Sequence, residues 1–234
     1  MSKALNTGIS VVIPSAGNST RMGGANKQLL LLDNIPVLVH TVRRFSRLPV
    51  ISEIIIVTRE SDIPVIQNLA DVYHLSKISK IIAGGDTRQE SVFLGLKQVK
   101  FSKVLIHDGA RPLVSGKNIF DLIKKLDDCN AAALGVPVKD TIKKVSKDGV
   151  IKETLNRSEL VQIQTPQGFN TKIILDAHRY AAENNISATD DCMLAESVGI
   201  PVYVVPGEYS NIKVTTPEDI LLCEVLQRQM SKQA

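Results

Sequence analysis

Residues 14–28 form a loop whose composition could bind a nucleoside triphosphate. Small residues lead it, so backbone N–H groups can approach phosphate oxygens closely. Arg21 and Lys27 then offer positive charge that suits a triphosphate. The loop has neither the Gly-Lys-Ser/Thr ending of a Walker A motif nor the three-glycine pattern of a dinucleotide fingerprint. An ordinary glycine- and serine-rich turn is the alternative interpretation.

A second loop, residues 84–92, also has residues suited to a nucleotide. Gly84 and Gly85 follow an apolar run, and the polar residues after them open a predicted helix, whose first N–H groups are free. Ser91 could donate to or accept from the edge of a base. The alternative is an ordinary capped helix start, with Asp86 as the N-cap.

A third loop, residues 106–112, places a carboxylate directly after a predicted buried strand. Mg²⁺ in proteins commonly keeps several waters and takes only one or two carboxylates. Asp108 is therefore the candidate ligand for a phosphate-bound metal ion. In the alternative interpretation, Arg111 pairs with Asp108 for a structural purpose.

The elements that must position these loops alternate regularly along the first half of the chain. Apolar runs predict strands at 9–13, 53–58, 78–83, 103–107 and 131–136, and helical spacing predicts helices at 37–45, 63–75, 92–99 and 119–126. This alternation predicts an α/β, Rossmann-like fold, with a mostly parallel sheet covered by helices on both faces. Ligands of such sheets bind at the carboxyl ends of the strands. The loops after Ile13, Ala83, His107 and Val136 are thus the expected site.

The pattern changes between residues 138 and 161. Two short β-rich runs flank an Asp148-Gly149 turn, which predicts a projecting β-hairpin arm. An isolated hairpin is marginal in water, so we expect it to pack on a partner subunit. Helices at 172–183, 191–198 and 217–229 and a strand at 202–205 complete one domain, 1–234, with 138–161 as its arm.

Composition narrows the function classes. The chain has 234 residues, of which 44% are hydrophobic, and a formal net charge of +4, which suits a small phosphorylated ligand. There is no tryptophan and no dense basic tract with interleaved aromatics, so nucleic acid is not an expected partner. Three widely spaced cysteines predict neither a disulfide framework nor a zinc site. No signal sequence or long apolar run is recognisable, so we expect a cytoplasmic protein without membrane contact.

The motifs, taken together, resemble one family. They are Ala16-Gly17, Arg21-Met22, Lys27-Gln28, Gly84-Gly85 with Arg88 and Ser91-Val92, His107-Asp108 with Ala110-Arg111-Pro112, the run 137–143, Arg157, Gln164-Thr165-Pro166-Gln167, Thr189-Asp190-Asp191 and Asn211-Ile212-Lys213-Val214-Thr215. Their order and spacing resemble the sugar- and polyol-phosphate cytidylyltransferases, in particular the 2-C-methyl-D-erythritol 4-phosphate cytidylyltransferase family. The chain departs from that pattern at five positions, of which Ser15 is the first. The family usually begins its first loop Ala-Ala-Gly, has glycine at Ser19, proline at Asn26 and alanine at Gly109, and often has tryptophan near Val161.

The resemblance implies a role for each matching residue. It assigns CTP binding to Ser15, Ala16, Gly17, Gly85, Arg88, Ser91 and Asp108, catalysis to Arg21, Lys27 and Lys213, acceptor binding to Asp108, Arg111, Thr141, Arg157 and Thr165, and a divalent cation such as Mg²⁺ to Asp108. It also implies a homodimer in which each arm reaches into the neighbouring subunit. The implied reaction moves CMP from CTP to a polyol phosphate in the non-mevalonate isoprenoid pathway.

Several alternatives remain at the level of sequence. Ribitol 5-phosphate or a related pentose phosphate is the nearest alternative acceptor. A non-catalytic nucleotide-binding protein would be expected to lose its phosphate-facing charges, and a dehydrogenase would need the missing fingerprint. Asp190-Asp191 could form a second metal site or a helix start capped by Thr189. We predict structural roles for His107 and His178.

Overall fold

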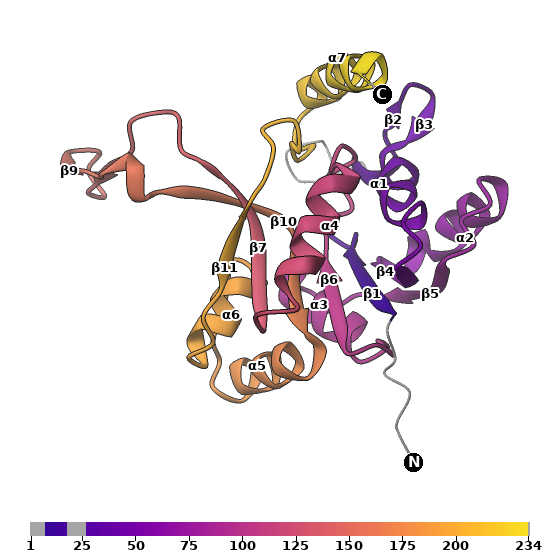
Figure 1. Cartoon of the computed structure of the whole chain (residues 1–234), viewed down its shortest axis with the longest axis horizontal. Coiled ribbons are helices and arrows are strands. Elements are labelled where there is room, and N and C mark those ends of the chain that lie inside the picture. Colours follow the sequence, from indigo (N-terminus) through magenta and orange to yellow (C-terminus); the bar gives the residue numbers. More distant parts are fainter. Residues whose placement is uncertain (1–7, 18–26, 234) are drawn as a thin grey trace.

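The computed structural model describes residues 8–17 and 27–233, with only the backbone of Lys27 and of 231–233 (Figure 1). The large sheet contains β1 (Ile9–Pro14), β4 (Ile51–Thr58), β5 (Ile78–Ala83), β6 (Lys103–Ile106), β7 (Ala131–Pro137), β10 (Val161–Asn170) and β11 (Tyr203–Pro206). Its strand order is β11-β7-β10-β6-β1-β4-β5. All neighbouring pairs are parallel except those of β10, which runs antiparallel to both β6 and β7. The predicted mostly parallel α/β sheet is confirmed.

Helices cover both faces of this sheet, because its inner strands alternate side chains between two cores. Val11 and Ile13 belong to one core, and Val12 between them belongs to the other. The first core packs under α1 (Val37–Ser46), α2 (Ile63–Val72) and α4 (Gly116–Lys125), and the second packs under α3 (Arg88–Leu96), α5 (Thr171–Glu183) and α6 (Asp191–Ser197).

The long strand β10 is the main element that the sequence did not predict. Pro166 lies within it, and proline normally argues against a central strand because it donates no ladder hydrogen bond. The structure accommodates Pro166 where the register with β7 shifts, between Ile163 and Gln167. Thus β10 occupies the middle of the sheet with a local irregularity at the Thr165-Pro166 step.

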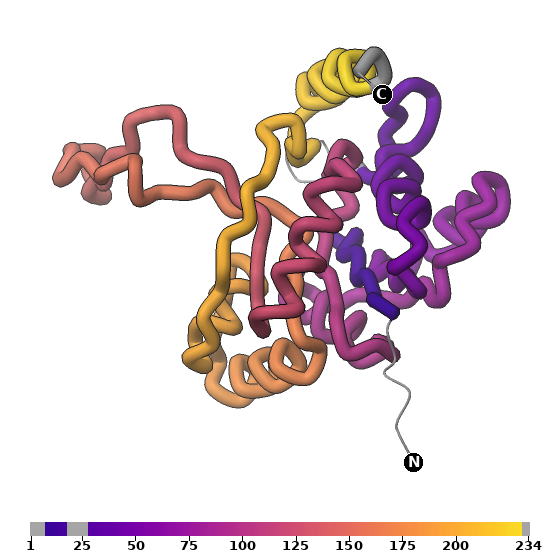
Figure 2. Tube along the Cα trace, viewed as in Figure 1, coloured from indigo at the N-terminus to yellow at the C-terminus, as the bar shows by residue number. Residues whose placement is uncertain are grey.

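Two short two-stranded sheets lie outside the large one. The first pairs β2 (Leu31–Leu32) with β3 (Ile35–Pro36), and α7 (Pro217–Gln233) packs beside it through a third small core (Figure 1). The second pairs β8 (Lys143–Val145) with β9 (Ile151–Thr154), which is the predicted hairpin. The tube in Figure 2 shows this hairpin extending far from the rest of the chain. No described helix has the length and apolar character needed to cross a membrane.

Candidate active site

A cavity of about 480 Å³ opens at the carboxyl ends of β1, β4, β5 and β6. It is lined by Pro14, Ala16, Gly17, Gln28, Arg59, Glu60, Gly84, Gly85, Asp86, Thr87, Arg88, Ser91, Asp108, Gly109, Ala110 and Lys213. Three of the four loops expected at the site contribute to this lining. The loop after Val136 does not, because it leads into the hairpin instead.

The first two loops approach each other closely at Gly84. A Cβ atom on Gly84 would lie 2.7 Å from the Cβ of Ala16 and 2.6 Å from Ser91 Oγ, so no larger residue fits there without movement. The Gly85 N–H donates to Ser91 Oγ over 3.2 Å. Ser91 therefore holds the second loop against the start of α3, at the wall of the cavity.

The start of α3 is capped, but not by the residue that the sequence indicated. Thr87, rather than Asp86, is the N-cap, and it forms a capping box with Glu90. The Glu90 carboxylate accepts from the N–H groups of both Asp86 and Thr87. Asp86 is left exposed at the cavity rim, because the cap lies one residue further along the chain.

Asp108 is the buried carboxylate of the described cavity lining, and three cations surround it. Lys213 Nζ lies 2.9 Å from Oδ2, Arg111 Nε lies 3.6 Å from Oδ2, and Arg88 Nε lies 3.3 Å from Oδ1. Burial alone would raise the pKa of Asp108, but these three cations hold it well below its usual range. The carboxylate is therefore ionised, and positive charge exceeds negative charge around it.

Thr165 binds the backbone of Asp108, and His107 in turn contacts Thr165. The Asp108 N–H donates to Thr165 Oγ1 over 3.0 Å, and His107 Nδ1 lies 3.1 Å from the same oxygen. His107 Nε2 lies 3.0 Å from the carbonyl oxygen of Arg111. Burial lowers the pKa of His107 to about 4, so its ring is neutral near pH 7. Both ring nitrogens are engaged within the protein, and neither His107 nor Thr165 lines the cavity.

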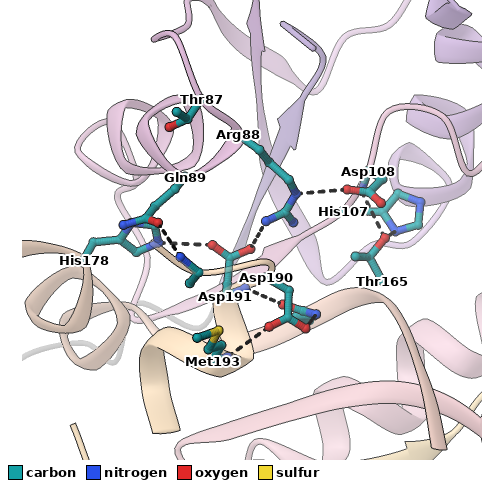
Figure 3. Close-up of polar contacts among 12 residues, drawn as sticks. Thr87, Arg88, Gln89, His107, Asp108, Thr165, His178, Asp190, Asp191 and Met193 are labelled. Atoms are coloured by element: carbon teal, nitrogen blue, oxygen red, sulfur yellow. Dashed lines mark hydrogen bonds and ion pairs between the residues drawn. The ribbon is translucent and has the colours of Figure 1, made fainter. Parts of the chain in front are cut away.

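Arg88 links the cavity to a second buried carboxylate, Asp191 (Figure 3). Arg88 Nη1 lies 2.8 Å from Asp191 Oδ2, and His178 Nε2 lies 3.1 Å from Asp191 Oδ1. Asp190, not Thr189, is the N-cap of α6, and its side chain accepts from the Met193 N–H. All four carboxylate oxygens of Asp190 and Asp191 have partners in the protein, which favours the structural helix start over a second metal site.

The remaining predicted residues lie in other places. Ser15 is buried behind the cavity wall, and Arg111 Nη1 donates to the carbonyl of Asn211 over 2.7 Å. Thr141 and Arg157 are exposed on the arm, where Arg157 Nη1 donates to the Lys139 carbonyl over 2.9 Å. Arg21 lies outside the described residues. Lys27 begins a 3-10 turn, η2 (Lys27–Leu29), directly before the cavity residue Gln28.

Arg59 and Glu60, for which the sequence predicted no role, line the cavity at the end of β4. The same rule about strand ends could have identified them, because β4 was a predicted parallel strand. Glu60 opens the short 3-10 turn η3 (Glu60–Asp62), and Arg59 Nε lies 3.3 Å from Asp62 Oδ2. These two residues add one positive and one negative charge to that side of the cavity.

Several known proteins are similar to this chain over most of its length. The family model described as IspD, 2-C-methyl-D-erythritol 4-phosphate cytidylyltransferase, matches residues 9–229. A protein of that name from Halalkalibacterium halodurans is 47% identical, with 93% of this chain and 96% of the relative covered. One from Bacillus cereus is 44% identical, with 95% and 99% covered.

A solved structure gives the same result. The crystal structure of 4-diphosphocytidyl-2C-methyl-D-erythritol synthase from Anaerococcus prevotii has a TM-score of 0.85 and 33% identity, with 95% of this chain and 96% of that chain covered. The fold, the cavity at the strand ends and the similarity over nearly the whole chain agree. This chain therefore belongs to the 2-C-methyl-D-erythritol 4-phosphate cytidylyltransferase (IspD) family.

Proposed function

We propose that the cavity around Asp108 is where this chain carries out the reaction of its family. The chain transfers CMP from CTP to 2-C-methyl-D-erythritol 4-phosphate, giving 4-diphosphocytidyl-2-C-methyl-D-erythritol and pyrophosphate. One observation carries the assignment to this cavity: Arg88, Arg111 and Lys213 gather around a single ionised carboxylate at the edge where parallel strands end. These three cations exceed the carboxylates of Asp108 and Asp191 by one positive charge, which suits a triphosphate.

The chemistry needs no general base. The acceptor is a phosphate monoester, whose second pKa of about 6 leaves it ionised near pH 7. One of its oxygens forms a bond to the α-phosphorus of CTP, and the bond to the β-phosphate oxygen breaks on the opposite side. Pyrophosphate leaves with the electron pair. The structural roles of His107 and His178 fit this scheme, since neither has to accept a proton.

Electrostatic stabilisation is then the main task of the side chains. Two anions must approach each other, and charge accumulates on the transferring group. Lys213 is more than one-third exposed and faces Asp108 at the cavity, so it is placed to contact the α-phosphate. We assign Lys27 and Arg21, which belong to the first loop, to the triphosphate. Ala16, Gly17, Gly85 and Ser91 would then contact the cytidine and phosphates.

The cavity also contains a carboxylate, that of Asp108, which is the type of ligand expected for Mg²⁺. Asp108 is ionised and lines the cavity, and its Oδ1 has one ion-pair partner, Arg88, within the described residues. A carboxylate offers about four lone-pair sites, and Mg²⁺ completes its shell with phosphate oxygens and water. Asp108 would thus hold the ion, which neutralises phosphate charge when bound.

The acceptor side of the site is assigned to the arm, residues 138–161. Thr141 and Arg157 lie on it, away from their own cavity, so we infer that they serve the cavity of a second copy. Val145, Val150 and Ile151 are more than half exposed on this hairpin, and a lone hairpin with such a surface is marginal in water. A homodimer with exchanged arms would cover these side chains. Asp108 would complete the acceptor site from the other subunit, and the predicted acceptor residues Arg111 and Thr165, which do not line the cavity, would hold Asp108 in place.

A direct assay tests this function. The protein is incubated with CTP, Mg²⁺ and either 2-C-methyl-D-erythritol 4-phosphate or ribitol 5-phosphate, and pyrophosphate release is measured. We expect release with the first acceptor to exceed release with the second by at least about 100-fold, as for a site built to hydrogen-bond its own substrate. CTP binding without pyrophosphate release from either acceptor would instead indicate a non-catalytic nucleotide-binding protein. Sedimentation analysis tests whether the protein is a dimer. We also propose a cytoplasmic location, because the three free cysteines of this chain suit a reducing compartment.

A further inference from the structure

Asp191 is a buried carboxylate that the reaction scheme does not use. It lies at the first position of α6, with no exposed surface, and is 103 residues from Arg88 along the chain. Its two oxygens are both engaged, Oδ2 with Arg88 Nη1 at 2.8 Å and Oδ1 with His178 Nε2 at 3.1 Å. Burying a carboxylate is costly unless it is paired, so these two contacts are needed to keep Asp191 ionised in the interior.

Other contacts fix Asp191 and its neighbours. Gln167 on β10 accepts from the Asp191 N–H over 3.1 Å and donates to Asp190 Oδ2 over 2.9 Å. His178 stacks on Phe93, with ring centroids 5.6 Å apart and planes 4° from parallel. Figure 3 shows Asp191 between His178 and Arg88, with Asp108 on the far side of the guanidinium. Asp191 thus has little freedom to move.

Two hydrogen-bonded routes connect Asp108, at the cavity, with β10. Asp108 reaches β10 directly, because its N–H donates to Thr165 Oγ1. It also reaches β10 through Arg88, Asp191 and Gln167, two positions further along the same strand. Arg88 is the only member of the Arg88–Asp191 pair that lines the cavity. Its Nε and Nη1 are directed by two carboxylates on different elements, which defines the plane of the guanidinium.

We propose that Asp191 is a positioning residue: it holds the Arg88 guanidinium, and through it the Asp108 carboxylate, in the orientation that CTP meets. The inference rests on the proposed assignment of Arg88 and Asp108 to the CTP site. Without the Asp191 charge, Arg88 would keep one fixed partner instead of two and could turn toward Asp108 or toward the cavity. The positive charge of Arg88 would still attract a triphosphate, but its guanidinium would no longer be held in one orientation.

The test compares two Asp→Asn substitutions that remove the same charge. Asp191→Asn changes the buried carboxylate. Asp176→Asn is the matched control, because the Asp176 side chain is half-exposed on α5 and pairs only with Lys172 and Arg179 among the described residues. Partners that orient metal-binding side chains typically contribute 10- to 100-fold to activity, and by analogy we expect kcat to fall by about 10-fold or more in Asp191→Asn. KM for CTP should change by less than about threefold, since the Arg88 charge is retained. The control should keep kcat within about twofold of wild type.

A double-mutant cycle separates positioning from a general structural role. In an Arg88→Gln background, Asp191→Asn should change kcat by less than about twofold, because the group through which it acts is already absent. A structural role would give the same fold-loss in both backgrounds and would follow the fraction of folded protein, measured by circular dichroism. Equal losses in both backgrounds, or an unchanged kcat in Asp191→Asn, would overturn the inference.

A second variant keeps the test decisive if Asp191→Asn does not fold. His178→Gln removes the ring that directs Asp191 Oδ1 but leaves both carboxylates in place. We expect kcat to fall by about threefold with little change in KM for CTP, and an unchanged kcat would contradict the inference. Wild-type protein is assayed first. If it releases no pyrophosphate, the proposed function fails, whereas an active wild type with an equally active Asp191→Asn enzyme contradicts only the positioning role.

Discussion

Ser15 and Gly109 are two departures from the family pattern, and the structure places them in contact. A Cβ atom on Gly109 would lie 2.4 Å from Ser15 Oγ, whereas the next nearest atoms, on Ile13 and Gln28, would lie at 3.3 and 3.4 Å. The family usually has alanine at both positions. We therefore predict that Gly109→Ala alone is harmful, and that Ser15→Ala rescues it.

The stability cost expected for Gly109→Ala depends on which of the neighbouring atoms can move. The Gly109 N–H donates to the Pro14 carbonyl over 3.4 Å, its carbonyl accepts from Thr41 Oγ1 over 3.0 Å, and the Ser15 N–H donates to the Val57 carbonyl over 2.6 Å, so both backbones are held. The added methyl must displace the Ser15 hydroxyl, and overpacking of this kind costs about 1–3 kcal/mol. Ser15 Oγ is buried without a hydrogen-bond partner in the described part of the chain, so Ser15→Ala should be neutral or stabilising by up to about 1 kcal/mol.

The double variant should regain wild-type stability and gain about 0.4–1 kcal/mol more, because alanine restricts the unfolded chain at a position with an ordinary φ. Urea unfolding of the four proteins without nucleotide measures each free energy of unfolding. We expect a coupling energy of about 1–3 kcal/mol between the two sites. Additive effects, or a Gly109→Ala protein as stable as wild type, would refute the steric reasoning.

Three further predictions concern charge and the arm. Lys213→Ala should lower turnover by about 10²–10³ in a folded protein, as for loss of one preorganised contact to a developing charge, and near-wild-type pyrophosphate release would contradict its role. Arg157→Ala should raise KM for the polyol phosphate by about tenfold, as for loss of a charged contact of about 1.4 kcal/mol, with KM for CTP unchanged; equal changes in both would argue against an acceptor role. Burial lowers the pKa of His107 from 6.5 to about 4, so between these values the unfolded chain binds a proton that the folded chain does not. The free energy of unfolding should therefore fall by roughly 2–3 kcal/mol from pH 7.5 to 4.5. His107→Gln should lack that component in urea unfolding at the two pH values.

Local patterns in the sequence predicted most of the fold. Strand β5 has the bounds that its apolar run predicted, and the predicted helices differ from the observed ones by only a few residues at their ends. The antiparallel strand β10 was not predicted because Pro166 carries a local signal against a strand. The bulged register that accommodates it depends on β7, which lies far away in sequence.

The candidate site was predictable where a strand end marks it and not where distant contacts build it. The loops after Ile13, Ala83 and His107 were predicted from strand ends and do line the cavity. The contact of Asp191 with the site was not predicted, because its position at the start of a helix already explained a carboxylate there. Its partner Arg88 lies on another helix, and only the folded chain shows that they pair. Helix caps are also ambiguous by one residue in sequence, as Asp86 and Thr87 illustrate.

The arm leaves the sheet at the end of β7 and returns at the start of β10, where Pro137 and Val161 are directly paired. The Val138 N–H donates to the Leu160 carbonyl over 3.2 Å, so the whole excursion begins and ends at one hydrogen-bonded point. A loop closed in this way can change its length or sequence without changing the distance between the strands that it joins. If the arm binds the acceptor and the cavity binds CTP, as proposed, then changes in the arm can alter the choice of acceptor in this family. The geometry of the nucleotide cavity would stay the same.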